Sequence, residues 1–356
     1  MTTGPAERLR ERIRREGPIS FADFMEEALY GEGGYYAREE LPIGEDGDFV
    51  TGSSHSPLFG HTTAELLRRL DQELGRPADY LEAGFGGGAH LRAVIEASKR
   101  ARRWLAYDRV ERRAPAWLEV GVEAGVEIDV EVSRLVTRWP ERSVNGLILS
   151  YELFDALPVH RLMQTEGGLR ELGVDVDSRD GFRWLEMAMS DSALGDLVPT
   201  ELERGQIADV ADWGAGYHEL ALRLGRGLIV TFDYGYTRER LFDARVRRNG
   251  TLACYRGQCV HRDALTAVGR QDLTAHIDFT ALQEAGEAVG LETVVLTRQA
   301  AWLAALGILD GLAERPARSR VEAMNLLDLD GMGEDIRVLV QARGVDVSRL
   351  IEVSLL

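Results

Sequence analysis

The sequence is poor in cysteine. Only Cys254 and Cys259 occur among its 356 residues, too few for a disulfide framework, so a reducing compartment is expected. The pair is also a poor zinc site, because no further cysteine or paired histidine accompanies it. We therefore expect neither structural disulfides nor a bound metal.

Long apolar runs and an excess of positive charge are missing as well. No run reaches the roughly 18 apolar residues of a membrane-spanning helix, and residues 1–17 lack the apolar segment of a signal peptide. Lys and Arg number 42 against 59 Asp and Glu, a net charge of −17, which repels nucleic acid and anionic lipid. We expect a cytoplasmic protein whose partner is a basic protein or a cationic ligand, although a high net charge by itself mainly keeps a protein soluble.

Strand-like and helix-like segments alternate from residue 79 onward. The strand-like segments lie at residues 79–84, 103–108, 126–132, 145–152, 227–235, 292–297 and 336–343. Helical patterns separate or follow them at residues 89–100, 111–124, 278–289 and 300–328. This rhythm predicts an α/β fold with a mostly parallel sheet and helices on both of its faces.

Two segments interrupt the rhythm, and an N-terminal helical segment precedes it. Residues 158–190 contain the pattern of short antiparallel strands, and residues 199–224 that of a helix. Residues 236–276 form a long polar stretch, typical of a functional loop or lid. The predicted domains are a helical cap with a lid loop (1–75) and a core (76–356) with insertions at about 158–224 and 236–330.

A glycine-rich turn, Glu82-Ala-Gly84-Phe85-Gly86-Gly-Gly88, joins the first core strand to the next helix. Glycines let the backbone turn sharply and let a ligand approach the main-chain N–H groups. The same residues satisfy the G-x-G-x-x-A pattern of NAD enzymes, so the turn alone does not choose the ligand. Glu82 favours S-adenosyl-L-methionine (SAM), because a carboxylate repels a pyrophosphate and suits the ammonium and sulfonium groups of SAM. A helix-packing turn with a surface glutamate is the structural alternative.

Acidic residues follow two other predicted strands. Asp108 ends the second strand, where a carboxylate can accept both hydroxyl groups of an adenosine ribose or cap the next helix. Glu152 and Asp155 follow the strand at 145–152, at the edge where open α/β sheets bind ligands. There they can hold a cationic methyl acceptor and take its proton, or they only stabilise a helix N-terminus.

His276 and two N-terminal residues are weaker candidates. Asp272 and Asp278 flank His276 and can hold its tautomer for proton transfer, unless Asp278 only caps the following helix. Tyr36 and Thr51 can close over SAM as part of a lid, or Tyr36 can pack the cap on the core.

Several blocks of the sequence resemble the MidA family of class I methyltransferases, whose mitochondrial members are arginine methyltransferases that assist complex I assembly. They include GDFVTGSSHSPLFG at 47–60 and SYELFDALPVHRL at 150–162. The other blocks lie at 17–36, 81–88, 232–236, 250–261, 271–282 and 332–344. They occur in the family's order along nearly the whole chain.

The resemblance implies a Rossmann-like class I fold: a mostly parallel seven-stranded sheet with an N-terminal helical cap and inserted antiparallel strands and helices. It implies SAM as cofactor, S-adenosylhomocysteine as product, and an arginine nitrogen of a partner protein as acceptor. Glu82, Gly84, Gly86 and Gly88 fall on the family's SAM loop, Asp108 on its ribose position, and Glu152 and Asp155 on its post-strand carboxylates.

The chain departs from the family at Tyr151, where asparagine is usual. This departure keeps open two alternatives, a SAM-binding assembly factor without transfer activity and a methyltransferase that acts on a small molecule. An NAD-type oxidoreductase is the alternative from another class, and a homodimer is a further hypothesis.

Overall fold

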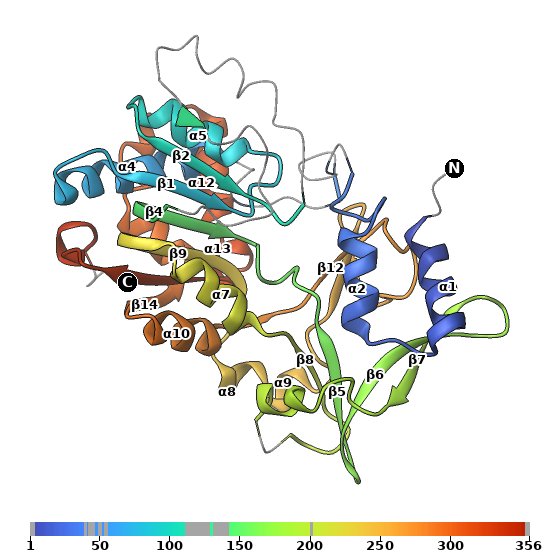
Figure 1. Cartoon of the computed structure of the whole chain (residues 1–356). Coiled ribbons are helices and arrows are strands. Elements are labelled where there is room, and N and C mark those ends of the chain that lie inside the picture. The colour runs from blue at the N-terminus through green and yellow to red at the C-terminus, as the bar shows by residue number, and fades with distance from the viewer. Residues whose placement is uncertain are drawn as a thin grey trace.

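The computed structural model describes residues 4–38, 41, 47–48, 52, 56–110, 129–130, 142–199 and 202–352. The helix predicted at 111–124, and the strand predicted at 126–132 apart from two residues, lie outside them. Figure 1 shows a central sheet between layers of helices, with a second lobe of strands and N-terminal helices beside it.

The central sheet has the strand order β14-β15-β9-β4-β1-β2-β3, and the short β13 pairs with β9. Its strands are β1 (Asp79–Ala83), β2 (Arg103–Tyr107), β3 (Asp129–Val130), β4 (Val144–Tyr151), β9 (Leu224–Tyr236), β13 (Ile277–Asp278), β14 (Glu292–Arg298) and β15 (Ile336–Arg343). Strand β15 is antiparallel to both of its neighbours, and the other pairings within the described residues are parallel. The predicted seven-stranded, mostly parallel sheet is confirmed, and β13 is an addition that the sequence did not predict.

Alternate residues of the central strands pack on opposite faces of the sheet. The core helices are α4 (Pro57–Leu74), α5 (Ala89–Ser98), α7 (Trp213–Ala221), α10 (Phe279–Ala288), α11 (Gln299–Ala305), α12 (Ala317–Leu326) and α13 (Met332–Asp335). On β4, Leu147 and Leu149 pack in one apolar cluster with α4 and α5, whereas Ile148 packs in the other with α7 and α10. Because helices cover both faces, β1 is buried along its whole length.

A second, antiparallel sheet lies in the segment between β4 and β9. It has the order β7-β6-β5-β8, with β5 (His160–Thr165), β6 (Gly168–Val176), β7 (Phe182–Met187) and β8 (Ile207–Val210). The antiparallel strands predicted at 158–190 are confirmed. The helix predicted at 199–224 is confirmed only in its second part, as α7 at Trp213–Ala221. Its first part is wrong, because Ile207–Val210 pairs with β5 and the Asp212 side chain then caps α7 by accepting from Ala215 N–H at 2.8 Å.

The N-terminal helices α1 (Pro5–Glu16) and α2 (Phe21–Tyr30) pack on this second sheet. Phe21 packs against Trp184 with ring centroids 4.9 Å apart, and Phe24 packs against Phe182 at 5.3 Å. These contacts bury the apolar face of α2. The domain limits predicted at residue 75 and within 158–330 stay a prediction.

The polar stretch after β9 contains a third, three-stranded sheet of order β11-β10-β12. Its elements are α8 (Arg238–Leu241), α9 (Ala244–Arg247), β10 (Ala253–Arg256), β11 (Cys259–His261) and β12 (Asp272–Thr274). Short 3-10 helices lie at Ser192–Leu197, Leu312–Glu314 and Val347–Arg349. Strand β12 lies beside α2 (Figure 1), so the third sheet meets the N-terminal helices. Every helix in the described part of the chain is too short or too polar to traverse a bilayer.

Candidate functional site

The glycine turn between β1 and α5 leaves room for a ligand. Gly84, Gly86 and Gly88 have φ angles of +83°, +53° and +72°, which favour glycine. A side chain on Gly88 would collide with the buried ring of Phe85. A Cβ atom on Gly86 would instead meet no described atom within 4 Å. The turn is therefore tight on its inner side and open on its outer side.

Asp108 holds this turn in place from the end of β2. Its Oδ2 accepts a 2.9 Å hydrogen bond from Gly86 N–H, and its Oδ1 accepts one of 3.2 Å from Val110 N–H. Gly84 N–H also donates to the Tyr107 carbonyl at 2.8 Å. Asp108 thus joins the end of β2 to the glycine turn. Its predicted contact with a ribose stays a prediction, and the helix that it could cap instead lies outside the described residues.

Glu82 is buried and points toward α5. Its Oε2 accepts from the Tyr80 hydroxyl at 3.0 Å and lies 2.9 Å from His90 Nδ1. The other ring nitrogen of His90 lies 3.2 Å from Thr63 Oγ1 on α4. Glu82 therefore joins β1 to the helix that begins at the glycine turn, and the alternative of an exposed surface glutamate is wrong. His90 was not predicted as a site residue, although it is the second residue of the helix predicted at 89–100, directly after the glycine turn.

Glu152 follows β4 in a strained backbone conformation. Its φ is +48°, and its N–H donates to the Phe232 carbonyl on β9 at 2.9 Å. Its Oε1 is buried and has no hydrogen-bond partner within the described structure. Burial raises the pKa of Glu152 well above its usual value, and the nearby charges of Asp233 and Asp272 raise it further. This carboxyl group is buried without a partner for its charge.

Asp155 and Asp233 lie next to Glu152. Burial raises the pKa of Asp155 well above its usual value, and Asp233, Glu152 and Asp272 add to the effect. Asp233, at the end of β9, accepts from Phe154 N–H at 2.8 Å and from Tyr234 N–H at 2.9 Å. Burial nevertheless raises the pKa of Asp233 to about 7. The first turn after β4 is thus fixed by a carboxylate of the neighbouring strand.

Asp272 brings the third sheet and the N-terminal segment to the same place. The Tyr36 hydroxyl donates to its side chain, and Leu273 N–H donates to its Oδ1 at 2.9 Å. Burial raises the pKa of Asp272 to about 7. The ring of Tyr36 packs between Tyr30, at 5.6 Å, and Tyr35, at 5.2 Å. Tyr36 therefore contacts an acidic side chain, and its predicted contact with SAM stays a prediction.

We call Glu152, Asp155, Asp233 and Asp272 the acid cluster. Within the described structure, no arginine, lysine or histidine forms an ion pair with any of its four carboxyl groups. Among the same residues, no group of three or more histidine, cysteine, aspartate or glutamate side chains is arranged to hold a metal ion. The described structure thus places four carboxyl groups near one another without a cationic partner. Its members were only half found from sequence, because Asp233 and Asp272 lie far from Glu152 along the chain.

His276 does not have the environment predicted for it. Asp278 accepts from Thr280 N–H at 2.9 Å and pairs with Arg238 at 2.7 Å, while Asp272 bonds elsewhere. The capping alternative for Asp278 is therefore the observed one. The imidazole lies beside the ring of Tyr236, with centroids 5.6 Å apart, and its Nδ1 is buried with no partner among the described atoms. Burial lowers the pKa of His276 to about 4, so the ring is neutral at pH 7.

Tyr151 has a packing role. Its hydroxyl donates to Gln299 Oε1 at 2.8 Å, and its ring stacks on Phe232 at 5.3 Å. It also meets the edge of Phe59 on α4. The departure from asparagine at this position is thus accounted for by contacts in the core. Thr51, predicted beside SAM, lies outside the described residues.

Comparison with known proteins agrees with this architecture. Residues 92–297, more than half of the chain, match the family model described as "Putative S-adenosyl-L-methionine-dependent methyltransferase". A crystal structure of a COG1565 superfamily member from Burkholderia thailandensis, bound to S-adenosyl-homocysteine, is similar with a TM-score of 0.85 and 27% identity. The match covers 96% of this chain and 92% of that one. The fold is therefore shared with a protein that binds the demethylated form of SAM.

Curated relatives are similar over most of the chain. Protein arginine methyltransferase NDUFAF7 of Bos taurus is 28% identical over 308 residues, which cover 76% of this chain and 66% of that protein. The NDUFAF7 homolog of Drosophila melanogaster is 26% identical over 319 residues, covering 80% and 70%. The chain thus spans about two thirds of the length of these relatives.

Both relatives are named as mitochondrial proteins. This finding contradicts the cytoplasmic location predicted from the sequence. The prediction was wrong because net charge and the lack of an apolar segment do not identify a compartment.

Proposed function

The chain belongs to this family of SAM-dependent methyltransferases, and we propose that it transfers the methyl group of SAM to an arginine side chain of a partner protein. Support for the acceptor comes from the name of the curated relatives and from the acid cluster. The single observation that carries the proposal is a set of four carboxyl groups with no cationic partner among the described residues: those of Asp155, Asp233 and Asp272 are buried, and Glu152 is half-buried with a buried Oε1.

The residues around the glycine turn fit SAM. Gly86 is open on its outer side, and its N–H is already oriented by Asp108. We propose that Gly84, Gly86 and Gly88 line the cofactor, that Asp108 contacts its ribose, and that Glu82 orients the turn through His90. When bound, SAM supplies an electrophilic methyl group on a sulfonium and leaves as S-adenosylhomocysteine.

The acid cluster fits a guanidinium group. Buried carboxylates are costly without a counter-ion, and a guanidinium offers five N–H donors in a planar fork that matches carboxylate oxygens. Glu152 Oε1 has no hydrogen-bond partner in the described structure, so it can accept from such a donor. We propose that Glu152 and Asp155 hold the guanidinium, while Asp233 and Tyr36 position them through Phe154 and Asp272.

The same carboxylates can remove the proton that methylation releases. As a guanidinium nitrogen forms its bond to the methyl carbon, the carbon–sulfur bond breaks and the nitrogen must lose one proton. Burial raises the pKa of Glu152 and so makes its carboxylate a stronger base, which suits a general base. The proton goes to Glu152 and then to water, and the products are methylarginine and S-adenosylhomocysteine. We give His276 no role in the proposal, because its ring packs on Tyr236 and no hydrogen bond from a described residue joins it to the acid cluster.

Methyl transfer from radiolabelled SAM into a cell lysate tests the proposal. We expect label on arginine of at least one protein, identified by mass spectrometry. The Glu152→Gln variant should bind SAM with unchanged affinity but transfer at least about a hundredfold more slowly, the usual scale for loss of a general base. Glu186→Gln, a change at an exposed position of β7 whose side chain pairs only with Arg170 in the described structure, is the matched control and should keep full activity.

Other results would contradict parts of the proposal. Label confined to small molecules would replace the protein acceptor, and SAM binding without any transfer would favour an assembly factor. Loss of SAM binding in Glu152→Gln would make Glu152 a cofactor ligand. The homodimer stays a hypothesis, and the molar mass of the protein measured by light scattering would test it.

A further inference from the structure

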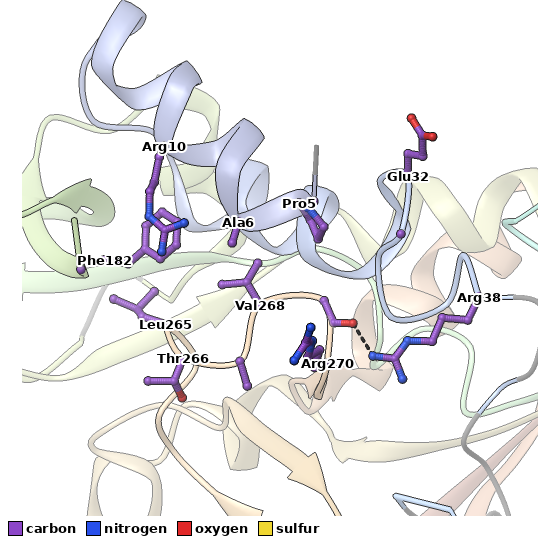
Figure 2. A pocket seen from close by; sticks show the side chains of 15 residues that line it. Pro5, Ala6, Arg10, Glu32, Arg38, Phe182, Leu265, Thr266, Val268 and Arg270 are labelled. Carbon is purple, nitrogen blue, oxygen red and sulfur yellow. Dashed lines mark hydrogen bonds between the residues drawn. The ribbon is translucent and has the colours of Figure 1, made fainter. Parts of the chain in front are cut away.

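A pocket of about 940 Å³ lies between the start of α1, the Glu32–Arg38 turn and the loop at 265–270 (Figure 2). None of its lining residues belongs to the glycine turn or to the acid cluster. Part of its wall is apolar and consists of Pro5, Ala6, Phe182, Leu265 and Val268. The pocket is large compared with a bare ion and lies in the size range of sites for extended organic ligands.

Three arginines make the rest of this pocket basic. Arg10, Arg38 and Arg270 line it together with a single acidic residue, Glu32. Figure 2 shows the Glu32 side chain directed away from Arg38 and Arg270. Arg10 and Arg38 are half-buried, and Arg270 is exposed. A positive pocket is unexpected on a chain with a net charge of −17.

No carboxylate of the described residues neutralises the charges of these arginines. Arg38 donates to the Gly269 carbonyl at 2.6 Å, and Arg10 donates to the Asp180 carbonyl at 2.9 Å. Neither these two nor Arg270 forms an ion pair with a carboxylate of the described structure. By contrast, three other arginines of α1 each pair with a carboxylate, namely Arg8, Arg12 and Arg14. The guanidinium groups of the pocket therefore retain donors for an anionic ligand.

The pocket adjoins the acid cluster through two short segments of chain. Arg38 lies two residues after Tyr36, and Arg270 lies two residues before Asp272. The Tyr36 hydroxyl donates to Asp272, so both segments enter the acid cluster at one point. Two residues of extended chain span at most about 7 Å. A basic site and an acidic site thus lie next to each other.

We propose that this pocket binds acidic side chains of the acceptor protein, a few residues away from the arginine that is methylated. The inference rests on the proposed function, since the acid cluster holds the arginine while the pocket holds the neighbouring aspartate or glutamate. A peptide segment fits better than a free anion, because the apolar wall can pack against its aliphatic carbons. The acceptor is then a segment with charges of both signs.

Peptide binding to the full chain tests the pocket separately from transfer. The probe is a fluorescein-labelled peptide, Ala-Asp-Glu-Leu-Asp-Glu-Ala, measured by fluorescence anisotropy beside a counterpart with lysine at each acidic position. We expect only the acidic peptide to bind. Arg270→Glu should weaken that binding by roughly tenfold, as loss and reversal of a charged contact do. Arg142→Glu, at an exposed position with no ion pair to a described residue, should leave it unchanged.

Three results would overturn the pocket proposal. The first is no binding of the acidic peptide, and the second is equal weakening by Arg142→Glu. The third is displacement of the peptide by inorganic phosphate at similar concentration, which would indicate a site for free anions. Glu152→Gln should not change the anisotropy result, so this binding is judged even if methyl transfer fails.

Transfer assays then test the link to the acceptor. Arginine peptides with acidic flanks should have a KM at least about fivefold lower than peptides with neutral flanks, at a similar kcat. Arg270→Glu should remove this difference without changing SAM affinity. An acidic peptide that binds the pocket but gives no preference in transfer would separate the pocket from the acceptor and refute the inference. Absence of transfer to any arginine would refute the proposed function instead.

Discussion

Replacing Asp272 with asparagine should change how the free energy of unfolding depends on pH. Burial raises the pKa of Asp272 from 3.8 to about 7. Between about pH 4 and pH 7 the folded protein therefore holds a proton that the unfolded chain has released, so stability falls as pH rises through this window. Asparagine does not ionise, and its side-chain oxygen can still accept from Leu273 N–H and from the Tyr36 hydroxyl.

The size of the effect follows from the pKa. A difference of 1 between the folded and unfolded pKa corresponds to about 1.4 kcal/mol. Ionising Asp272 in the folded protein therefore lowers the free energy of unfolding by on the order of 4 kcal/mol above pH 7. Roughly 2–3 kcal/mol of this cost arises between pH 5 and pH 8. The Asp272→Asn variant should therefore gain stability relative to the wild type over that range. It should also hold a cationic acceptor less well, because one carboxylate of the acid cluster is lost.

Urea unfolding of the ligand-free protein, followed by tryptophan fluorescence between pH 5 and pH 8, measures this difference. Asp196→Asn, at an exposed position without a hydrogen bond from a described residue, is the control and should run parallel to the wild type. If the Asp272→Asn curve also runs parallel to the wild type, Asp272 ionises at an ordinary pH. The electrostatic account of the acid cluster would then be wrong.

Three further predictions concern the cofactor and the pH dependence. Gly86→Val should abolish SAM binding in calorimetry, because its side chain would enter the open side of the turn, and should also lower the melting temperature, because a φ of +53° strains a β-branched residue; normal SAM affinity would place the cofactor elsewhere. Asp108→Ala should weaken SAM binding by about 1–3 kcal/mol, and an unchanged affinity would leave Asp108 with only its backbone contacts to Gly86 and Val110. The kcat/KM for the acceptor should rise as pH increases from about 6 to 8, because ionisation of Asp233 and Asp272, both with a pKa of about 7, adds negative charge around the guanidinium that Glu152 and Asp155 hold. A flat profile would contradict this reading.

Much of the core could be predicted because its signals are local. The apolar strands, the glycine turn after β1 and the acidic residues that end β2 and β4 are each readable within a few positions of the sequence. Their partners follow from the rule that parallel strands end at one edge of the sheet. The inserted strands at 158–190 were also readable, since alternation and turn residues mark them.

The parts that could not be predicted depend on contacts between distant segments. Asp233 and Asp272 meet Glu152 only because β9 pairs with β4 and β12 packs near α2. His276 and Asp278 illustrate the opposite error. They are close in the sequence and were predicted to interact, but Asp278 caps the next helix whereas His276 packs beside Tyr236. Tyr151, the departure from the family that left the acceptor open, packs its side chain against the core and bonds to Gln299.

The inserted sheet between β4 and β9 also constrains the order of folding. Strand β4 ends at Tyr151 and its partner β9 begins at Leu224. During synthesis, the edge of β4 that pairs with β9 therefore stays unpaired until the whole insertion has been made. An unpaired central edge is prone to aggregate. The second sheet, with its short hairpins and the earlier-made α1 and α2, has its own partners available first. We expect it to form before the core closes, so that mutations in β5 or β6 lower the yield of folded protein even where they leave the acid cluster untouched.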